Sequence, residues 1–322
     1  IKIMNIGFIG LGKLGLPCAL AIDSVKKHNV MGFDVDSNVN EYLIDRKIPY
    51  REEGAHELLE THDISFDSPE NVIKNSDIIF LPIQTPHDEM YEGVTRIPDS
   101  RVDFDYSFLK EGVKEVSNIL DDLKKEKIIV IISTVLPGTI DREIKPILSK
   151  YAKLCYNPFF IAMGTTINDF MNPEFVLMGV DDKEAASTLK EFYSTLHSKD
   201  VFECSINEAE LIKVSYNTFI TMKICLANTV TELSHKLTNI DSDKVMGALK
   251  ISNQRLISSK YLDGGMGDGG GCHPRDNIAL RWMSENLGLG YDLFDAIMAA
   301  REVQARNLAE RLVRTGLPNV VI

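Results

Sequence analysis

The segment "GDGGGCHPRD", residues 267–276, places a cysteine directly after three consecutive glycines. Glycine runs occur where the backbone folds tightly or approaches another molecule closely. In such a loop Cys272 can attack an aldehyde to form a thiohemiacetal, which becomes a thioester once hydride has been lost. Asp276, four residues later, can take protons through a water molecule. The alternative is that Cys272 is a small buried core residue, which a glycine-rich loop does not favour.

Lys213 and Asn217 lie four residues apart in a long helical pattern, so they share one face of the predicted helix. A lysine ammonium and an amide N–H aimed at one point can hold an oxyanion. The simple alternative is a solvated lysine on an exposed helix face, and the spacing alone favours it. The segment around Cys272 shifts the interpretation toward a catalytic pair.

The sequence "NIGFIGLGKLGLP" contains three glycines in the pattern Gly-x-Gly-x-x-Gly after an apolar strand and before a helical stretch. Asp34 follows Gly15 by nineteen residues, at the end of the next predicted strand. This order is typical of a dinucleotide site, and the carboxylate favours NAD over NADP. A tight turn without ligand and a flavin site are the alternatives. The predicted cofactor contacts in this region are Gly10, Gly12, Lys13, Leu14, Gly15 and Asp34.

Two later strand ends carry "PIQTP", with Thr85 and Pro86, and "ISTVLPGT", with Ser133 and Thr134. In open α/β sheets, ligands gather beyond the carboxyl ends of the strands. The same residue types also make ordinary turns. The sequence leaves both interpretations open, and we include Thr85, Pro86 and Ser133 among the expected cofactor contacts.

Short apolar runs alternate with amphipathic stretches through the first two hundred residues, which predicts an α/β fold with a mostly parallel, doubly wound Rossmann-like sheet. The predicted strands are Ile3–Ile9, Val30–Asp34, Ser76–Ile83, Ile128–Thr134, Lys153–Tyr156, Phe175–Val180 and Val201–Glu203.

After Cys204 the pattern becomes helical, with no Gly or Pro for more than thirty residues and a capping box formed by Ser205 and Glu208. A helix of this length, roughly 45 Å, predicts a domain connection or a dimer interface. The expected domains are 1–204, 205–315 and, from 316 to 322, the start of a truncated C-terminal domain.

The composition is that of a globular protein, with 322 residues, 44% hydrophobic and 25% charged. No apolar run approaches the ~20 residues needed to cross a bilayer. The net charge of −12 argues against a nucleic-acid partner. Five scattered cysteines argue against a disulfide framework and against zinc. No secretory signal opens the chain, so we expect a cytoplasmic protein. From the cysteine pattern we expect no bound metal.

With these elements in order, the chain resembles the nucleotide-sugar 6-dehydrogenase family, which includes UDP-glucose and GDP-mannose dehydrogenases. The resemblance rests on "GFIGLGKLGLP", "STVLPGT", "YNPFFIAMGTTINDFMNPEFVLMG", "AELIKVSYN" and "GGGCHPRD". It implies a Rossmann-like domain, a central helical domain and a homodimer across the long helix. It also implies NAD-dependent oxidation of a sugar C6 alcohol through aldehyde and thioester to carboxylate. A UDP-sugar is the expected substrate.

The resemblance implies a role for each matching residue. Cys272 is the nucleophile, Lys213 and Asn217 stabilise oxyanions, and Asp276 and Thr134 hold the catalytic water. The expected substrate contacts are Phe159, Phe160, Met163, Gly265, Gly267, Gly269, Gly270, Gly271 and Arg275.

The chain departs from the family pattern in two places. Phe159 and Met163 stand where the family has glutamates, and the first of these is its candidate base for thioester hydrolysis. The chain also stops at "NVVI", where the family's C-terminal nucleotide-binding domain begins. An outlying branch of the family is therefore expected. The alternatives are a β-hydroxyacid dehydrogenase that makes a single hydride transfer, or a nucleotide-sugar-binding protein with impaired turnover.

Overall fold

The computed structural model describes residues 3–91, 93, 98–236, 238–254, 256, 258, 260–261, 263–265, 267, 270–289 and 292–316. The chain divides into two compact units. The first unit combines residues 1–85 with 106–213, and the second combines 86–105 with 214–322. Among the described helices, none is long and apolar enough to cross a membrane.

The first unit is built on one eight-stranded sheet with the order β3-β2-β1-β4-β5-β6-β7-β8. All neighbouring strands are parallel except the antiparallel pair β6 and β7. The strands are β1 (Asn5–Ile9), β2 (Asn29–Phe33), β3 (Ser65–Phe66), β4 (Ile78–Leu81), β5 (Lys127–Ile131), β6 (Ala152–Tyr156), β7 (Val176–Val180) and β8 (Val201–Cys204). The predicted fold class is confirmed.

Helices cover this sheet because its central strands are buried on both faces, as in β4, where every residue is buried. One face packs against α1, α6 and α7 through a core that includes Phe8, Phe80 and Phe192. The helices of the first unit are α1 (Gly15–Ser24), α2 (Asn38–Ile44), α3 (Ala55–Thr61), α4 (Pro69–Asn75), α5 (Ser107–Leu123), α6 (Thr166–Met171) and α7 (Lys183–Leu196), with a π-helical turn η2 (Ile140–Ile144) and a 3₁₀ turn η3 (Lys145–Ile147).

The strand order reverses between β1 and β4, because the chain first adds β2 and β3 on one side of β1 and then places β4 on the other. Strands β1, β4, β5 and β6 all run parallel, so their carboxyl ends meet at one edge of the sheet. This edge, at such a reversal, is where α/β sheets bind ligands.

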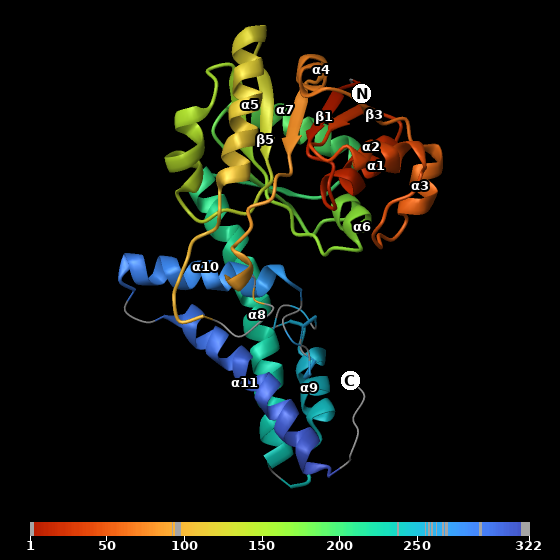
Figure 1. The fold of residues 1–322 in the computed structure, drawn as a ribbon. Coiled ribbons are helices and arrows are strands. Elements are labelled where there is room, and N and C mark those ends of the chain that lie inside the picture. The colour runs from red at the N-terminus through yellow and green to blue at the C-terminus, as the bar shows by residue number, and fades with distance from the viewer. Residues whose placement is uncertain are drawn as a thin grey trace. The chain divides into compact units, whose positions relative to one another are not determined.

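The long predicted helix is α8 (Ile206–Lys236), the extended teal helix of Figure 1. Its predicted capping box is confirmed, since the Glu208 carboxylate accepts the Ser205 N–H at 2.8 Å and the Ser205 hydroxyl accepts the Glu208 N–H at 3.3 Å. Residues up to Lys213 belong to the first unit and the remainder to the second.

The second unit combines most of α8 with α9 (Ser242–Ile251), α10 (Cys272–Leu287), α11 (Leu293–Arg314) and the 3₁₀ turn η1 (Glu89–Tyr91). We call residues 86–105 the 86–105 segment, of which 92 and 94–97 lie outside the described residues. Arg101 fixes this segment by donating to the Arg281 carbonyl at 2.8 Å and pairing with Asp292. The Arg301 guanidinium donates to the Gly93 carbonyl.

The structure divides the chain at Lys213 and assigns the 86–105 segment to the second unit, whereas the sequence predicted one boundary at residue 204. The first predicted domain, 1–204, is continuous in sequence. The structure differs because Arg101 pairs with residues 180 and 191 positions away, and no local pattern shows such a pairing. All seven predicted strands are present. The short strand β3 was not predicted, because two residues are too few for a periodic pattern. The predicted third domain falls on residues 316–322, of which only Gly316 is described.

Candidate functional site

The glycine loop after β1 has the geometry of a phosphate-binding turn. Gly10 has φ of +116°, and a Cβ at Gly15 would lie 2.1 Å from the Gly10 carbonyl oxygen. A Cβ at Gly12 would meet no atom within 4 Å, so the backbone there is open to a ligand. Helix α1 begins at Gly15 and directs its positive end at this space. The loop therefore fits the pyrophosphate of a dinucleotide.

Asp34 follows β2 and lies beside the glycine loop. Its Oδ2 accepts the Leu11 N–H at 2.6 Å, and its Oδ1 accepts the Asp36 N–H at 2.9 Å. The carboxylate is half-buried, so it remains within reach of a ribose. In the same loop, the Lys13 side chain is exposed and Leu14 packs against the core.

The structure brings together the residues predicted at the ends of β4 and β5. The Thr85 hydroxyl donates to the Thr134 carbonyl at 2.7 Å, and the Ser133 hydroxyl donates to the Ile83 carbonyl. These bonds tie together the ends of two strands in the same sheet as β1, which carries the glycine loop. Pro86 begins the 86–105 segment, and its carbonyl accepts the Asp105 N–H at 2.7 Å.

Lys213 is buried, with 8% of its surface exposed, so the alternative of a solvated surface lysine is wrong. Its ammonium donates to the Phe159 carbonyl at 2.8 Å and lies 5.0 Å from the centre of the Phe160 ring. Both the carbonyl dipole and the ring face favour the positive charge. The turn after β6 therefore holds this lysine in place.

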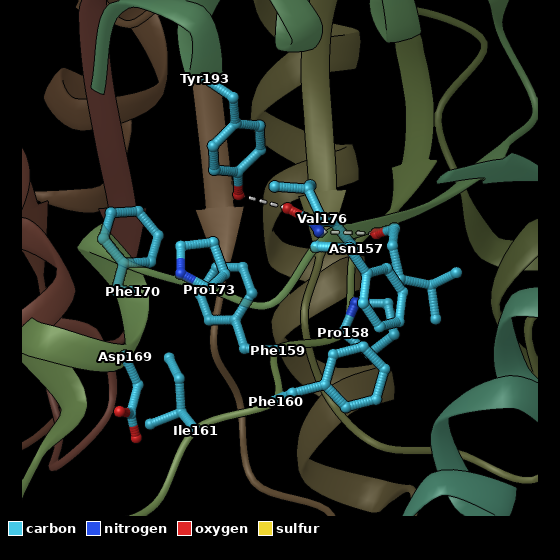
Figure 2. Close-up of a pocket in the computed structure, with 12 residues that line it drawn as sticks. Asn157, Pro158, Phe159, Phe160, Ile161, Asp169, Phe170, Pro173, Val176 and Tyr193 are labelled. Carbon is cyan, nitrogen blue, oxygen red and sulfur yellow. Dashed lines mark hydrogen bonds between the residues drawn. The ribbon is translucent and has the colours of Figure 1, made fainter. Parts of the chain in front are cut away.

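Figure 2 shows the aromatic residues in and around the same turn. The Phe159 ring packs on Phe170 with centroids 5.3 Å apart, and Phe160 packs on Phe175 at 5.0 Å. Asn157 anchors the turn, because its amide donates to the Leu177 carbonyl at 2.7 Å and its carbonyl oxygen accepts the Tyr193 hydroxyl (Figure 2). We call Phe159, Phe160, Phe170 and Phe175 the aromatic cluster. Met163 is 59% exposed beyond it.

Glu210 lies one helical turn before Lys213 and is fully buried. Its two carboxylate oxygens accept the N–H groups of Gly138 at 2.6 Å and Ile140 at 2.8 Å, which follow the Ser133–Thr134 strand end. Burial raises the pKa of Glu210 to about 7, although the two backbone bonds act in the opposite direction. The sequence analysis missed this residue, although it lies within "AELIKVSYN".

Cys272 is the first residue of α10, and its side chain is exposed, so the alternative of a buried core cysteine is wrong. The N-terminus of a helix carries a positive partial charge that favours a nearby thiolate. Asp276, one turn later, is fully buried. Its Oδ2 accepts the Asn217 amide at 2.6 Å. The second unit thus pairs two of the predicted catalytic residues directly.

A buried polar network holds the first turn of α10 on α8. The Asn277 amide donates to the Thr221 hydroxyl at 3.0 Å and to the His273 carbonyl at 2.7 Å, while the Thr218 hydroxyl donates to the Asn277 carbonyl oxygen at 3.0 Å. The His273 ring is buried beside Tyr261. This network fixes the position of α10, the helix that carries Cys272 and Asp276.

The glycine-rich loop before α10 is open. Gly265 and Gly270 have φ of +90° and +130°, and a Cβ at Gly267, Gly270 or Gly271 would meet no atom within 4 Å. The Gly265 N–H donates to the Asn228 side chain at 2.9 Å. Gly269 lies outside the described residues. The Arg275 guanidinium lies 5.3 Å from the centre of the Phe104 ring, which also stacks on His87.

No group of three or more His, Cys, Asp or Glu side chains in the described part of the chain is arranged to hold a metal ion. The first unit offers a dinucleotide loop and a fixed lysine, and the second offers an exposed thiol beside a buried carboxylate.

Comparison with known proteins assigns both parts of the chain. Residues 4–197 match the model of the UDP-glucose/GDP-mannose dehydrogenase family, NAD binding domain, and residues 207–303 match its central domain. A UDP-glucose 6-dehydrogenase of Rickettsia conorii is 26% identical over 316 residues, which are 96% of this chain and 69% of that protein. A GDP-mannose 6-dehydrogenase of Pseudomonas putida is 26% identical over 325 residues, covering 95% of this chain and 70% of that protein.

Among solved structures, a UDP-glucose dehydrogenase from the hyperthermophilic archaeon Pyrobaculum islandicum superposes with a TM-score of 0.78 at 26% identity. The match covers 95% of this chain and 68% of that one. The chain thus spans about two thirds of the length of these relatives.

Proposed function

Because the chain belongs to the UDP-glucose/GDP-mannose dehydrogenase family, with NAD as its cofactor, we propose that it oxidises the C6 alcohol of a UDP-sugar to the uronic acid through Cys272. The observation that carries this proposal is the first turn of α10. It presents an exposed thiol one turn before a buried carboxylate that Asn217 holds.

The proposed cofactor contacts lie in and around the glycine loop after β1. NAD, when bound, supplies the hydride acceptor. Gly10, Gly12 and Gly15 open the backbone to its pyrophosphate, and Asp34 accepts from its ribose hydroxyl. Lys13, Leu14, Thr85, Pro86 and Ser133 complete the cofactor contacts.

Cys272 attacks the aldehyde carbon and forms the thiohemiacetal, which loses a second hydride to become the thioester. Lys213 and Asn217 stabilise the oxyanions, and Asp276 with Thr134 holds the water. The substrate contacts are Phe159, Phe160, Met163, Gly265, Gly267, Gly269, Gly270, Gly271 and Arg275.

The proposal includes a homodimer through α8. In the second unit Phe219, Met222 and Leu226 are 45%, 38% and 52% exposed and lie at i, i+3 and i+7, which is one stripe of the helix. Exposed apolar stripes of this kind mark interfaces. Sedimentation of the chain should give twice its 36.1 kDa mass, and Phe219→Asp should give the monomer. A wild-type monomer would contradict the dimer.

The test of the catalytic proposal is the stoichiometry of NADH. Incubation with NAD and UDP-glucose, and then with other UDP- and GDP-sugars, should give two NADH for each uronic acid formed. One NADH per sugar with an aldehyde product would favour a single hydride transfer.

A second candidate function is a nucleotide-sugar-binding protein with impaired turnover. The aromatic cluster favours it, because Phe159 supplies no carboxylate in the turn where the family has one. This candidate predicts sugar binding with neither NADH nor a covalent adduct, so the same experiment separates the two.

A further inference from the structure

Thioester hydrolysis needs a group that removes a proton from water, and Phe159 cannot supply it. The described residues of the second unit contain three buried polar atoms without a hydrogen-bond partner in the structure: His87 Nε2, Arg275 Nε and Asp276 Oδ1. Buried polar atoms normally have a partner, so each such atom requires an explanation, and a catalytic role is one. Two of the three belong to the turn of α10 that begins with Cys272.

The hydrogen bonding of His87 leaves it in the form that a base requires. Its Nδ1 lies 3.2 Å from the Tyr91 carbonyl oxygen, which can only accept. Nδ1 therefore carries the proton, and Nε2 keeps its lone pair. The side chain is 5% exposed, so its orientation is fixed by packing.

The neighbours of His87 connect it to Arg275 and Asp276. Its ring stacks on Phe104 with centroids 4.7 Å apart and 17° between the planes, and the Arg275 guanidinium carbon lies 5.3 Å from the centre of the same ring. Arg275 Nε is 3.7 Å from Asp276 Oδ1. His87, Phe104, Arg275 and Asp276 form what we call the histidine cluster.

Burial, more than the charges around it, keeps His87 neutral. Burial and the nearby Arg275 charge lower the pKa of His87 to about 4, and Asp88 acts in the opposite direction. At neutral pH Nε2 is therefore unprotonated. The contact of the 86–105 segment with α10 is close, because a Cβ at Gly93 would lie 2.6 Å from Pro274 Cβ. The segment is thus packed on the turn that carries Cys272.

We propose that His87 is the general base that activates water for hydrolysis of the Cys272 thioester. The assignment rests on the proposed function. In this step the water oxygen forms a bond to the acyl carbon while the carbon–sulfur bond breaks. One water proton moves to Nε2 of His87 and then returns to the Cys272 thiolate, so the products are the carboxylic acid and the free thiol. No oxidant or reductant is consumed.

The experiment compares wild type with His87→Gln in a single turnover, with NAD and the sugar from a panel containing UDP-glucose and GDP-mannose that gives NADH. NADH is read by absorbance and the Cys272 adduct by intact-protein mass spectrometry. The variant should form NADH and adduct at the wild-type rate, but lose the adduct about 10²- to 10³-fold more slowly. Decay at the wild-type rate would overturn the assignment.

Two further variants separate a base from a merely structural histidine. His87→Ala should recover adduct decay when free imidazole is added, and a folded variant without recovery would count against the base. His62→Gln is the matched control, because the half-buried His62 ring likewise lies 3.1 Å from a carbonyl oxygen, that of Leu43. It should leave decay unchanged. If wild type gives neither NADH nor adduct, the proposed function itself fails, and the assignment with it.

Discussion

The turn after β6 in the first unit and the first turn of α10 in the second unit differ in the polarity of their side chains. The first is closed by the aromatic cluster, and its lysine ammonium is directed at a main-chain carbonyl. The second keeps an exposed thiol, a buried carboxylate and polar atoms that no side chain satisfies among the described residues. Under the proposed mechanism, the nucleophile lies in the second turn and the base that serves it is His87 rather than a residue of the first turn.

The two turns are also held rigid by different hydrogen bonds. Asn157 holds the first turn through one hydrogen bond to the Leu177 carbonyl of the sheet and one to the Tyr193 hydroxyl of α7. The Asn277 network holds the second between two helices. Both turns are therefore fixed by a buried amide.

The largest expected effect comes from removing the nucleophile of the second turn. Cys272→Ser should form no uronic acid, because the alcohol oxygen does not give a thioester, and at most the first oxidation should remain. The product is identified by mass spectrometry after extended incubation. Uronic acid formed at the wild-type rate would remove Cys272 from the mechanism.

A smaller loss is expected from Lys213, the α8 residue that contacts the first turn. Lys213→Met should lower kcat by about 10²- to 10³-fold, because it removes one preorganised donor to the developing oxyanion. Lys190→Met is the control, since that lysine is exposed and paired with Glu203. Equal kcat values for the two variants would show that Lys213 only supports the turn.

A pH-dependent contribution to stability is expected from Glu210, which lies one helical turn before Lys213 in α8. In the folded state the pKa of Glu210 is about 7, above the usual value of about 4.3 for an unfolded glutamate. Its contribution to stability is therefore full below the unfolded pKa and is lost as pH rises through 7. Relative to Glu210→Gln, the wild-type free energy of unfolding should fall by up to about 3 kcal/mol between pH 5 and pH 8.

Denaturant titrations across this pH range measure the difference between the two proteins. Glu208→Gln is the control, because its bonds to Ser205 lower the pKa of Glu208 and confine its effect to acid pH. Parallel pH profiles for wild type and Glu210→Gln would show that the buried carboxyl does not titrate near neutrality.

The smallest effect concerns the cofactor loop, which neither turn contains. Asp34→Ala should weaken NAD binding by about 10- to 100-fold, which corresponds to the loss of a hydrogen bond to a charged group. It should also reduce the preference for NAD over NADP. Calorimetry with both cofactors measures this, and an unchanged preference would place Asp34 away from the ribose.

Much of the fold could be predicted from local patterns. The glycine spacing, the alternation of strands with helices and the Ser205–Glu208 box each act within a few residues, and the structure contains all three. The start of α10 was not predicted in this way, because the sequence placed Cys272 and Asp276 in the glycine-rich loop, with the helix beginning at Asn277, whereas α10 begins at Cys272.

The remaining features depend on contacts between distant residues. Glu210 binds N–H groups about 70 residues away, and Arg101 holds the 86–105 segment to residues about 190 positions later. No local pattern encodes these pairings. The sequence analysis did not single out His87 for the same reason. A role for a histidine after "QTP" can be inferred only from its packing with Phe104 and Arg275.

The most direct test of the account is rapid-quench mass spectrometry with peptide mapping during the first turnover with NAD and a reactive nucleotide sugar. The account predicts an acyl adduct on Cys272 that appears with NADH formation and disappears as uronic acid forms. NADH and uronic acid produced without any adduct on Cys272, or with an adduct on one of the four other cysteines, would contradict it.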